Sequence, residues 1–192
     1  MDTENTQATI KQKQRQRKAK ALRSLLIRTT LLVVILYVLL FHIVGLTAMK
    51  NGDMSPKIET GDLLLYYRLE SRIKSQDVVI LEKAVNKDMT AAQTETSKQQ
   101  YVCRVVACPG DVVDLTNETG LTINGNAVVE TGIYFQTKPY EGYVEYPVTL
   151  GENEYFVLAD YRNGGVDSRF FGPVTSNEIK GVLITLMRRN SL

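Results

Sequence analysis

Residues 51–62 read NGDMSPKIETGD and separate an apolar run from Leu63–Tyr67, the first segment with the pattern of a strand. Glycine, aspartate, asparagine and proline favour turns, so this stretch predicts a loop. The run before it, residues 29–49, contains no Asp, Glu, Lys or Arg. As a helix with a rise of about 1.5 Å per residue, it spans the roughly 30 Å hydrocarbon core of a bilayer. The sequence therefore predicts one transmembrane helix, residues 29–49, followed by a domain.

Basic residues are concentrated before the apolar run. Residues 1–28 hold eight of the 23 Lys and Arg residues but only two of the 21 Asp and Glu residues. Because positive flanks stay inside the cell, we expect 1–28 to be a basic cytoplasmic segment, flexible until the membrane orders it. The sequence predicts a single-pass protein of the cytoplasmic membrane with residues 50–192 outside. A nucleic-acid partner is not expected, since the excess of basic residues is confined to this segment.

A cleavable signal peptide is the alternative interpretation of the apolar run. Gly45–Ala48 offers the small residues that a cleavage site needs. The run is, however, longer than the roughly 7–15 apolar residues of a secretory signal, which favours a permanent membrane helix.

The residues after position 50 have the pattern of strands and turns. Asn124-Gly125 lies between Leu121–Ile123 and Ala127–Val129, and Asn-Gly between apolar residues predicts a hairpin because its turn needs positive φ twice. No long stretch with a period of 3.6 residues follows position 50, so the fold class is mostly β with one N-terminal membrane helix. The other expected strands are Leu63–Tyr67, Val78–Leu81, Tyr101–Val106, Tyr155–Leu158 and Val182–Met187.

Lys83–Gln100 is polar and poor in aromatic residues, which predicts a long surface loop or insert, with a short helix conceivable at Met89–Ala92. Cys103 and Cys108 would lie about 16 Å apart in an extended strand, so we expect two unpaired thiols. One histidine and two cysteines supply no zinc ligand set, and neither a metal nor a cofactor is expected.

Four short motifs follow one another along the chain. They are Asp53–Pro56 with a following Gly61-Asp62, then Gln76–Val79, then Cys103–Asp111, and then Ala159–Gly172. In this order they resemble four motifs of the type I signal peptidase family, membrane-anchored serine proteases that cut signal peptides outside the membrane. The family's motifs are Ser-Met-x-Pro with a following Gly-Asp, a short Gly-Asp-(Ile/Val)-Val-Val, Lys-Arg-Val-x-Gly-x-Pro-Gly-Asp, and Gly-Asp-Asn followed by Ser-x-Asp-Ser-Arg. The resemblance implies a β-rich, signal-peptidase-like domain.

The departures from the family pattern fall on the catalytic positions. The resemblance places Asp53 where the family has its serine nucleophile and Cys103 where it has its lysine base. A hydroxyl nucleophile needs a base to take its proton, and neither a lone carboxylate nor a thiol forms such a pair. Ser55 with Lys57 is a slipped alternative, disfavoured because Met54 and Pro56 match the family register. We therefore expect no catalytic residues.

Other family positions are retained in part. Asn51 lies two residues before the serine position, where its side-chain amide could donate a hydrogen bond, and Met54 is expected in the substrate groove or the core. Tyr161 and Gly165 replace the family's Asn and Ser. The remaining matches are interpreted as a charged network that supports the fold: Arg104, Asp160, Arg162, Asp167, Ser168 and Arg169.

The resemblance extends to degenerate signal-peptidase-like proteins that assist sortase-dependent pilus assembly in Gram-positive bacteria. It implies a noncatalytic chaperone or assembly factor with a secreted precursor or pilin as partner, and sortase as a further partner. The first alternative is an active signal peptidase with an altered site. The second is a nonenzymatic anchor that binds envelope components through its acidic surface.

Overall fold

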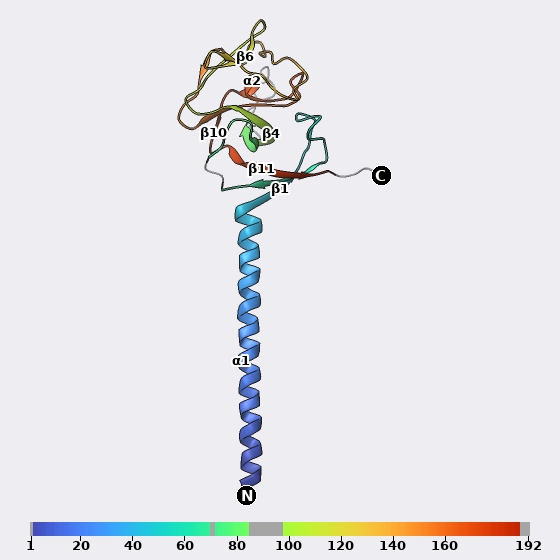
Figure 1. Ribbon diagram of the computed structural model, residues 1–192, viewed down its shortest axis with the longest axis vertical. Helices are drawn as coiled ribbons and strands as arrows, with labels where there is room; N and C mark the ends of the chain where they lie inside the picture. Colours follow the sequence, from blue (N-terminus) through green and yellow to red (C-terminus); the bar gives the residue numbers. More distant parts are fainter. Residues whose placement is uncertain (1, 70–71, 85–97, 189–192) are drawn as a thin grey trace. The chain divides into compact units, whose positions relative to one another are not determined.

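The protein is described by a computed structural model that covers residues 2–69, 72–84 and 98–188, with side chains from residue 15. The chain divides into two units, Met1–Ile43 and Val44–Leu192. The first unit consists of helix α1, Asp2–Val38, continued by one π-helical turn, η1, Leu39–Ile43 (Figure 1). Within the described residues, Arg15–Ile43 is the one helix long and apolar enough to cross a membrane.

Residues 1–28, expected to be flexible until the membrane orders them, belong to α1, which begins at Asp2. The Gln, Lys, Arg and Ala residues there favour helix. The expected end of the membrane helix is wrong. The membrane helix is predicted to reach residue 49, but helix ends at Ile43 and β1, Val44–Ala48, follows. A span of about 20 residues must therefore begin before Thr29.

Strand β1 forms because it pairs antiparallel with β2, Leu63–Tyr67, over five residue pairs. Gly45 of β1 faces the ring of Tyr66, and a Cβ at this position would lie 2.1 Å from Cζ of that ring. Because Val44–Ala48 pairs with β2, this part of the apolar stretch forms a strand and does not continue the helix.

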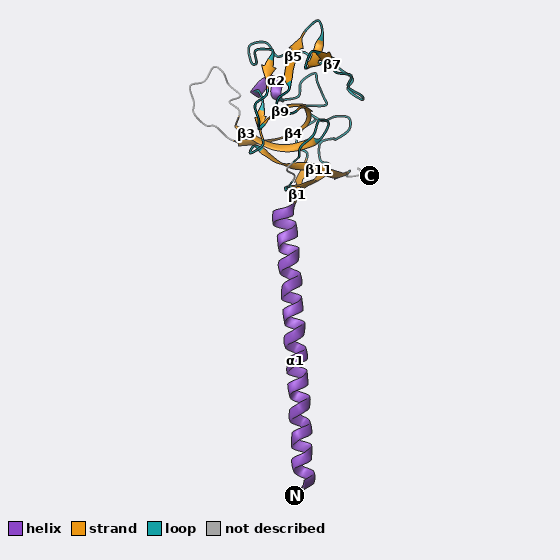
Figure 2. Ribbon diagram, turned by 60° about the vertical axis from the view of Figure 1, so that its left-hand side comes forward, coloured by secondary structure: helices purple, strands orange, loops and turns teal. Residues whose placement is uncertain are grey.

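The larger sheet has seven strands in the order β1-β2-β11-β3-β4-β9-β10. Within the described residues, the neighbouring strands of this sheet pair antiparallel, as β3 does with β4 and β4 with β9 (Figure 2). The predicted strands are confirmed, most of them longer than expected. The strands other than β1 and β2 are β3, Val78–Ala84; β4, Lys98–Ala107; β9, Glu154–Leu158; β10, Val174–Thr175; and β11, Ile179–Met187.

The smaller sheet has four strands in the order β7-β6-β5-β8. They are β5, Val112–Thr116; β6, Gly120–Ile123; β7, Asn126–Ala127; and β8, Val148–Thr149. The Asn124-Gly125 turn is confirmed, with φ of 51° and 76°. The expected strand Ala127–Val129 is too long, since pairing with β6 ends at Ala127 and Val129 is exposed.

The predicted polar insert, residues 83–100, is shorter than expected. Its ends belong to strands, because Lys83 and Ala84 of β3 pair with Gln99 and Lys98 of β4. Residues 85–97, with the conceivable helix Met89–Ala92, lie outside the described residues. The one helix described after β1 is α2, Ser168–Phe171.

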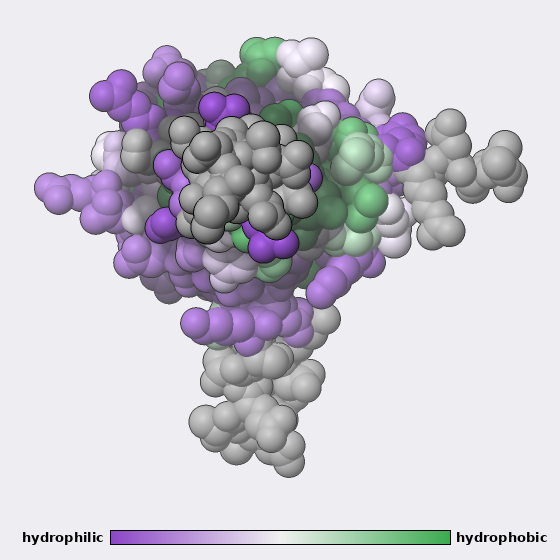
Figure 3. Space-filling model, turned by 90° about the horizontal axis from the view of Figure 1, so that it is seen from below, coloured by the Kyte–Doolittle hydropathy of each residue, from purple (hydrophilic) through white to green (hydrophobic). Residues whose placement is uncertain are grey.

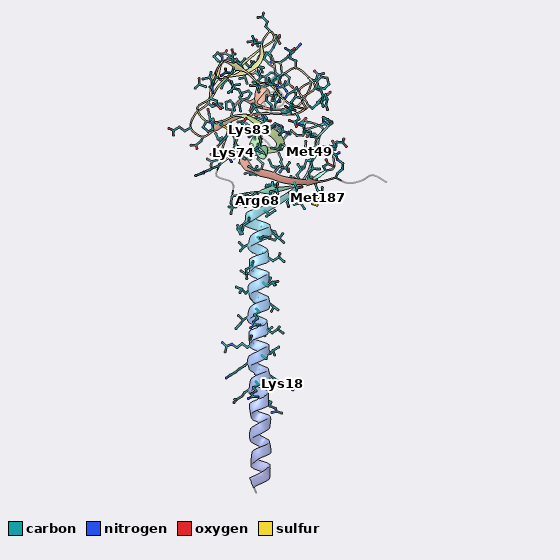
Figure 4. All side chains as sticks on the ribbon, viewed as in Figure 1. Lys18, Met49, Arg68, Lys74, Lys83 and Met187 are labelled. Atoms are coloured by element: carbon teal, nitrogen blue, oxygen red, sulfur yellow. The ribbon has the colours of Figure 1, made fainter. Side chains whose placement is uncertain are left out.

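The sheets bury the core and leave one apolar face exposed. On β2, Leu64 is fully buried whereas Leu63 is exposed, and Met187 of β11 lies opposite Leu63 (Figure 4). Leu46 of β1 and Ile184 of β11 are exposed as well. Figure 3 shows hydrophobic side chains, in green, gathered on part of the face in view. Exposed apolar patches of this kind mark surfaces that meet a membrane or a partner.

Candidate functional site

The loop of residues 51–62 is held by a buried methionine. Met54 is fully buried in a core cluster with Ile58 and Leu64, so it is a core residue. Met49 fixes the two ends of the loop, since its amide donates to the Asp62 carbonyl and its carbonyl accepts from Gly61, each at 2.9 Å. The loop is therefore a firm support for Asn51 and Asp53.

Asp53 accepts hydrogen bonds through both its side chain and its backbone. The Asn51 side-chain amide donates to a carboxylate oxygen of Asp53 at 2.5 Å, and the Asp53 carbonyl accepts from the Tyr161 amide at 2.8 Å. The Asn51 amide, expected to be available for a reacting oxygen, is thus engaged by Asp53. Tyr161 comes from the segment after β9, so this backbone bond links two of the motifs.

Cys103 lies in the middle of β4 and is fully buried in a cluster with Val79, Val105 and Val157. Its thiol lies 3.9 Å from the carbonyl oxygen of Val166. Burial raises the pKa of the Cys103 thiol well above its usual value, and the negative charges of nearby carboxylates, Asp53 among them, raise it further. Cys103 is therefore a neutral thiol at physiological pH, and it is unpaired, as is Cys108.

A cavity of about 330 Å³ adjoins these residues. Val166 closes it on one side, and the other lining residues come from two segments of the chain. Those residues are Lys50, Asn51 and Asp53 from the loop and Lys98, Gln99, Gln100 and Tyr101 from β4. Ser55 does not line this cavity. Lys57 lies 4.0 Å from a carboxylate oxygen of Asp160 and donates to the Thr131 carbonyl, so it is engaged elsewhere.

The first half of β4 has an open edge at this cavity. Within the described part of the chain, β4 pairs with β3 from Lys98 to Arg104, but its pairing with β9 begins only at Arg104. Among the residues that the structure describes, 98–103 therefore have a paired strand on one side only, and Lys98–Tyr101 of this stretch line the cavity. An unpaired strand edge presents backbone donors and acceptors to another extended chain.

Three arginines of the fourth motif and β4 pair with carboxylates. Arg104 donates to both carboxylate oxygens of Asp160, at 2.8 and 2.7 Å, and this hydrogen bonding raises the pKa of Arg104. Arg169 donates to both oxygens of Asp167, at 2.9 and 2.8 Å. The predicted charged network thus contains two separate bidentate pairs, which fix a fold more firmly than single contacts.

The third pair joins residues far apart in the sequence. Arg162 is buried and donates to both carboxylate oxygens of Glu130 and to the Thr137 hydroxyl. Glu130 and Thr137 are not predicted from the sequence, because nothing in their local pattern indicates a partner 32 or 25 residues away. The cavity residues Lys50, Lys98 and Tyr101 are not predicted either.

The side chains of Ser168 and Asp167 accept hydrogen bonds from backbone amides. The Ser168 hydroxyl accepts from the Val157 amide at 3.0 Å, and both residues are buried. One Asp167 oxygen accepts from the Ala159 amide at 2.9 Å, and the other accepts from the Arg169 amide, which caps α2. These bonds join β9 to α2 and place Val166 over the cavity.

A family model described as signal peptidase, peptidase S26, matches residues 22–187. This match includes β1, the loop, both sheets and all the motifs above. The chain belongs to the signal peptidase S26 family. Its mostly β fold with one N-terminal apolar helix agrees with this membership.

Relatives within the signal peptidase family are bacterial. Signal peptidase I of Bacillus caldolyticus is 30% identical over 145 residues, covering 69% of this chain and 72% of that protein. Probable signal peptidase I-2 of Synechocystis is 24% identical over 131 residues, covering 68% of this chain. The chain spans 57% of the length of that Synechocystis protein. A solved signal peptidase I from Enterococcus faecalis matches with a TM-score of 0.42 and 23% identity, over 59% of this chain and 98% of that one.

Signal peptidases are membrane-associated and act on secreted precursors, and one N-terminal apolar helix is consistent with a single membrane anchor. The cavity beside β4 is the place in this signal peptidase domain where a loop residue, an open strand edge and the β9–α2 connection meet. It is our candidate functional site.

Proposed function

We propose that this chain is a membrane-anchored member of the signal peptidase family that binds an extended segment of a secreted precursor without cutting it. The observation that carries the proposal is the pair of residues at the candidate site. Asp53 lines the cavity as a hydrogen-bonded carboxylate, and Cys103 is a buried thiol with a raised pKa. By the motif correspondence, these two occupy the serine and lysine positions of the family.

Peptide hydrolysis by a hydroxyl nucleophile needs a group that accepts its proton. Asp53 offers no hydroxyl, and the protonated Cys103 thiol accepts no proton at physiological pH. Lys50 and Lys98 line the cavity, but both are exposed and neither accompanies a hydroxyl at the position of Asp53. The described side chains around the cavity therefore support no nucleophile and base pair.

Binding needs none of this chemistry. An extended peptide can add to the open edge of Lys98–Cys103 through its backbone, as in strand addition to a sheet. Its side chains would alternate between the cavity and solvent, because successive residues of a strand face opposite ways. The loop with Asn51 and Asp53 would flank the bound chain on the other side.

Placement at the membrane follows from the helix and from the domain surface. We propose that the basic N-terminal residues lie in the cytoplasm and that the domain lies outside, because positive flanks stay inside. Leu46, Leu63 and Met187 on the exposed face of β1, β2 and β11 would then suit the membrane surface.

The partner that we propose is a pilin of a sortase-assembled pilus in a Gram-positive bacterium, with sortase nearby. This part rests on the resemblance to degenerate signal-peptidase-like proteins of pilus assembly. A chaperone could bind an extended precursor segment at the open edge of β4, and this binding would need no nucleophile.

A cleavage assay with the full-length chain in detergent tests the proposal. The substrates are a signal-peptide precursor and a pilin precursor, and the variants are Asp53→Ala and the revertant Asp53→Ser with Cys103→Lys. We expect the natural chain to bind precursor without cutting it. Turnover by the natural chain that is lost in Asp53→Ala would overturn the proposal in favour of an active peptidase. Failure to bind either precursor would overturn the binding function.

A further inference from the structure

A second, larger cavity adjoins the candidate site. Its volume is about 630 Å³, and it lies between residues 138–143, the connection Gly164–Val166, and α2. Its lining is rich in rings, from Pro139, Tyr140, Tyr143 and Phe170, with Lys138 and Glu141 among the polar residues. Neither the charged network nor the proposed backbone binding of a precursor explains this group of rings.

The rings of this aromatic cavity are held in place. Tyr143 and Phe170 pack with ring centroids 4.3 Å apart, although Tyr143 is 44% exposed. Tyr140 donates to the Gly165 carbonyl at 2.9 Å, and the Arg169 guanidinium lies 4.3 Å from the centroid of its ring. Arg169 is itself paired with Asp167, so the Tyr140 side of the cavity wall is held by contacts within the domain.

The two cavities share one residue. Val166 lines the cavity beside β4 and also the aromatic cavity. The carbonyl oxygen of Val166 lies 3.9 Å from the Cys103 thiol, and Cys103 is the last residue of β4 before its pairing with β9 begins. A chain that adds to Lys98–Tyr101 and continues past Val166 would therefore lie next to the aromatic cavity.

We propose that the aromatic cavity binds an aromatic side chain of the same extended segment that adds to β4. An aromatic ring can stack on Tyr143 or Phe170 in offset or edge-on geometry, which a small aliphatic side chain cannot. A ring also buries more apolar area, so it makes better use of a site of this volume. The inference rests on the proposed peptide binding and adds a preference for one aromatic residue at a fixed distance from the paired segment.

The test uses the full-length chain in detergent and labelled peptides of about 12 residues, long enough to follow β4 and pass Val166. The base peptide alternates threonine and alanine, and a second set carries one phenylalanine at successive positions. Binding is measured by fluorescence anisotropy with the natural chain, with Tyr143→Ala and with the control Tyr134→Ala. Tyr134 is 76% exposed and does not line the aromatic cavity.

We expect one phenylalanine position to bind about tenfold tighter than the base peptide, as ring packing plus burial in a preformed site implies. Tyr143→Ala should remove most of that gain and leave the base peptide's affinity unchanged, which also shows that the variant is folded. Tyr134→Ala should change neither affinity.

The two proposals fail differently in this experiment. If the base peptide binds but no phenylalanine position improves it, or if Tyr143→Ala leaves the gain intact, the aromatic site is refuted and peptide binding stands. If Tyr143→Ala weakens both peptides equally, the residue has no selective role and the aromatic site is again refuted. If no peptide binds, the proposed function fails and the aromatic site fails with it.

Discussion

A Cβ atom placed on Gly165 would lie 2.3 Å from the Cβ of Ala159 and 2.8 Å from the carbonyl oxygen of Tyr161. The motif that this chain resembles has glycine at the position of Ala159 and serine at that of Gly165. The two differences are therefore complementary, since the methyl group of Ala159 fills the space that a side chain at 165 would need.

Replacing Gly165 alone should destabilise the domain. Gly165→Ser forces a side chain against Ala159 in a buried region, and overpacking of this kind costs about 1–3 kcal/mol of unfolding free energy. Adding Ala159→Gly should restore part of the loss, because it removes the clashing methyl group but leaves the Tyr161 carbonyl oxygen 2.8 Å from the new Cβ. Urea denaturation of the full chain in detergent measures both.

The control for this pair is Gly52→Ser, since a Cβ at Gly52 would meet nothing within 4 Å. It should leave the unfolding midpoint nearly unchanged. If the change in unfolding free energy of the double variant equals the sum of the changes in Gly165→Ser and Ala159→Gly, the two positions do not pack against each other as described.

Breaking the buried Asp167–Arg169 pair should be costly. Asp167→Asn leaves the buried Arg169 guanidinium without its counter-charge, and removing one partner of such a pair costs about 3–5 kcal/mol. The matched control is Glu82→Gln in the exposed pair of Glu82 with Lys180, where the cost should stay below about 1 kcal/mol. Thermal unfolding followed by circular dichroism compares them, and similar shifts in the two variants would show that Asp167 is dispensable.

The two thiols should differ in reactivity. Cys103 is fully buried with a strongly raised pKa, so at neutral pH it should react with iodoacetamide only when the domain unfolds. Cys108 is partly exposed and should react in the native state, although burial raises its pKa as well. Mass spectrometry of alkylated Cys103→Ala and Cys108→Ala chains separates the two. Rapid native labelling of Cys103 would mean that the thiol is reached from the cavity.

The raised pKa of Cys103 also predicts a pH dependence of stability. An unfolded cysteine ionises near pKa 8.5, whereas the folded Cys103 keeps its proton to higher pH. Its contribution to stability is therefore complete below about pH 8 and is lost as the pH rises toward the folded pKa, by up to about 1.4 kcal/mol per pH unit. Cys103→Ala should flatten the stability curve between about pH 8 and pH 10 relative to the natural chain. Parallel curves for the two would contradict the assignment.

Much of the fold follows from local patterns. Leu63–Tyr67 and the Asn124-Gly125 turn are where the sequence predicts them, because alternation of burial and positive φ are properties of a few neighbouring residues. The helix end was predicted wrongly, since Val44–Ala48 becomes a strand only through its partner β2. An apolar stretch of this kind is compatible with either a helix or a strand, and the pairing with β2 decides between them.

The sequence by itself determined the N-terminal apolar helix without its exact end, the β class and the order of the motifs. The tertiary structure decided how the residues of those motifs are placed. It alone brings Glu130 to Arg162, leaves the first half of β4 without a second partner strand, and places Val166 in the lining of two cavities. The physical reason is that composition and spacing act along the chain, whereas charge pairing, burial and cavities depend on which distant segments the sheets bring into contact.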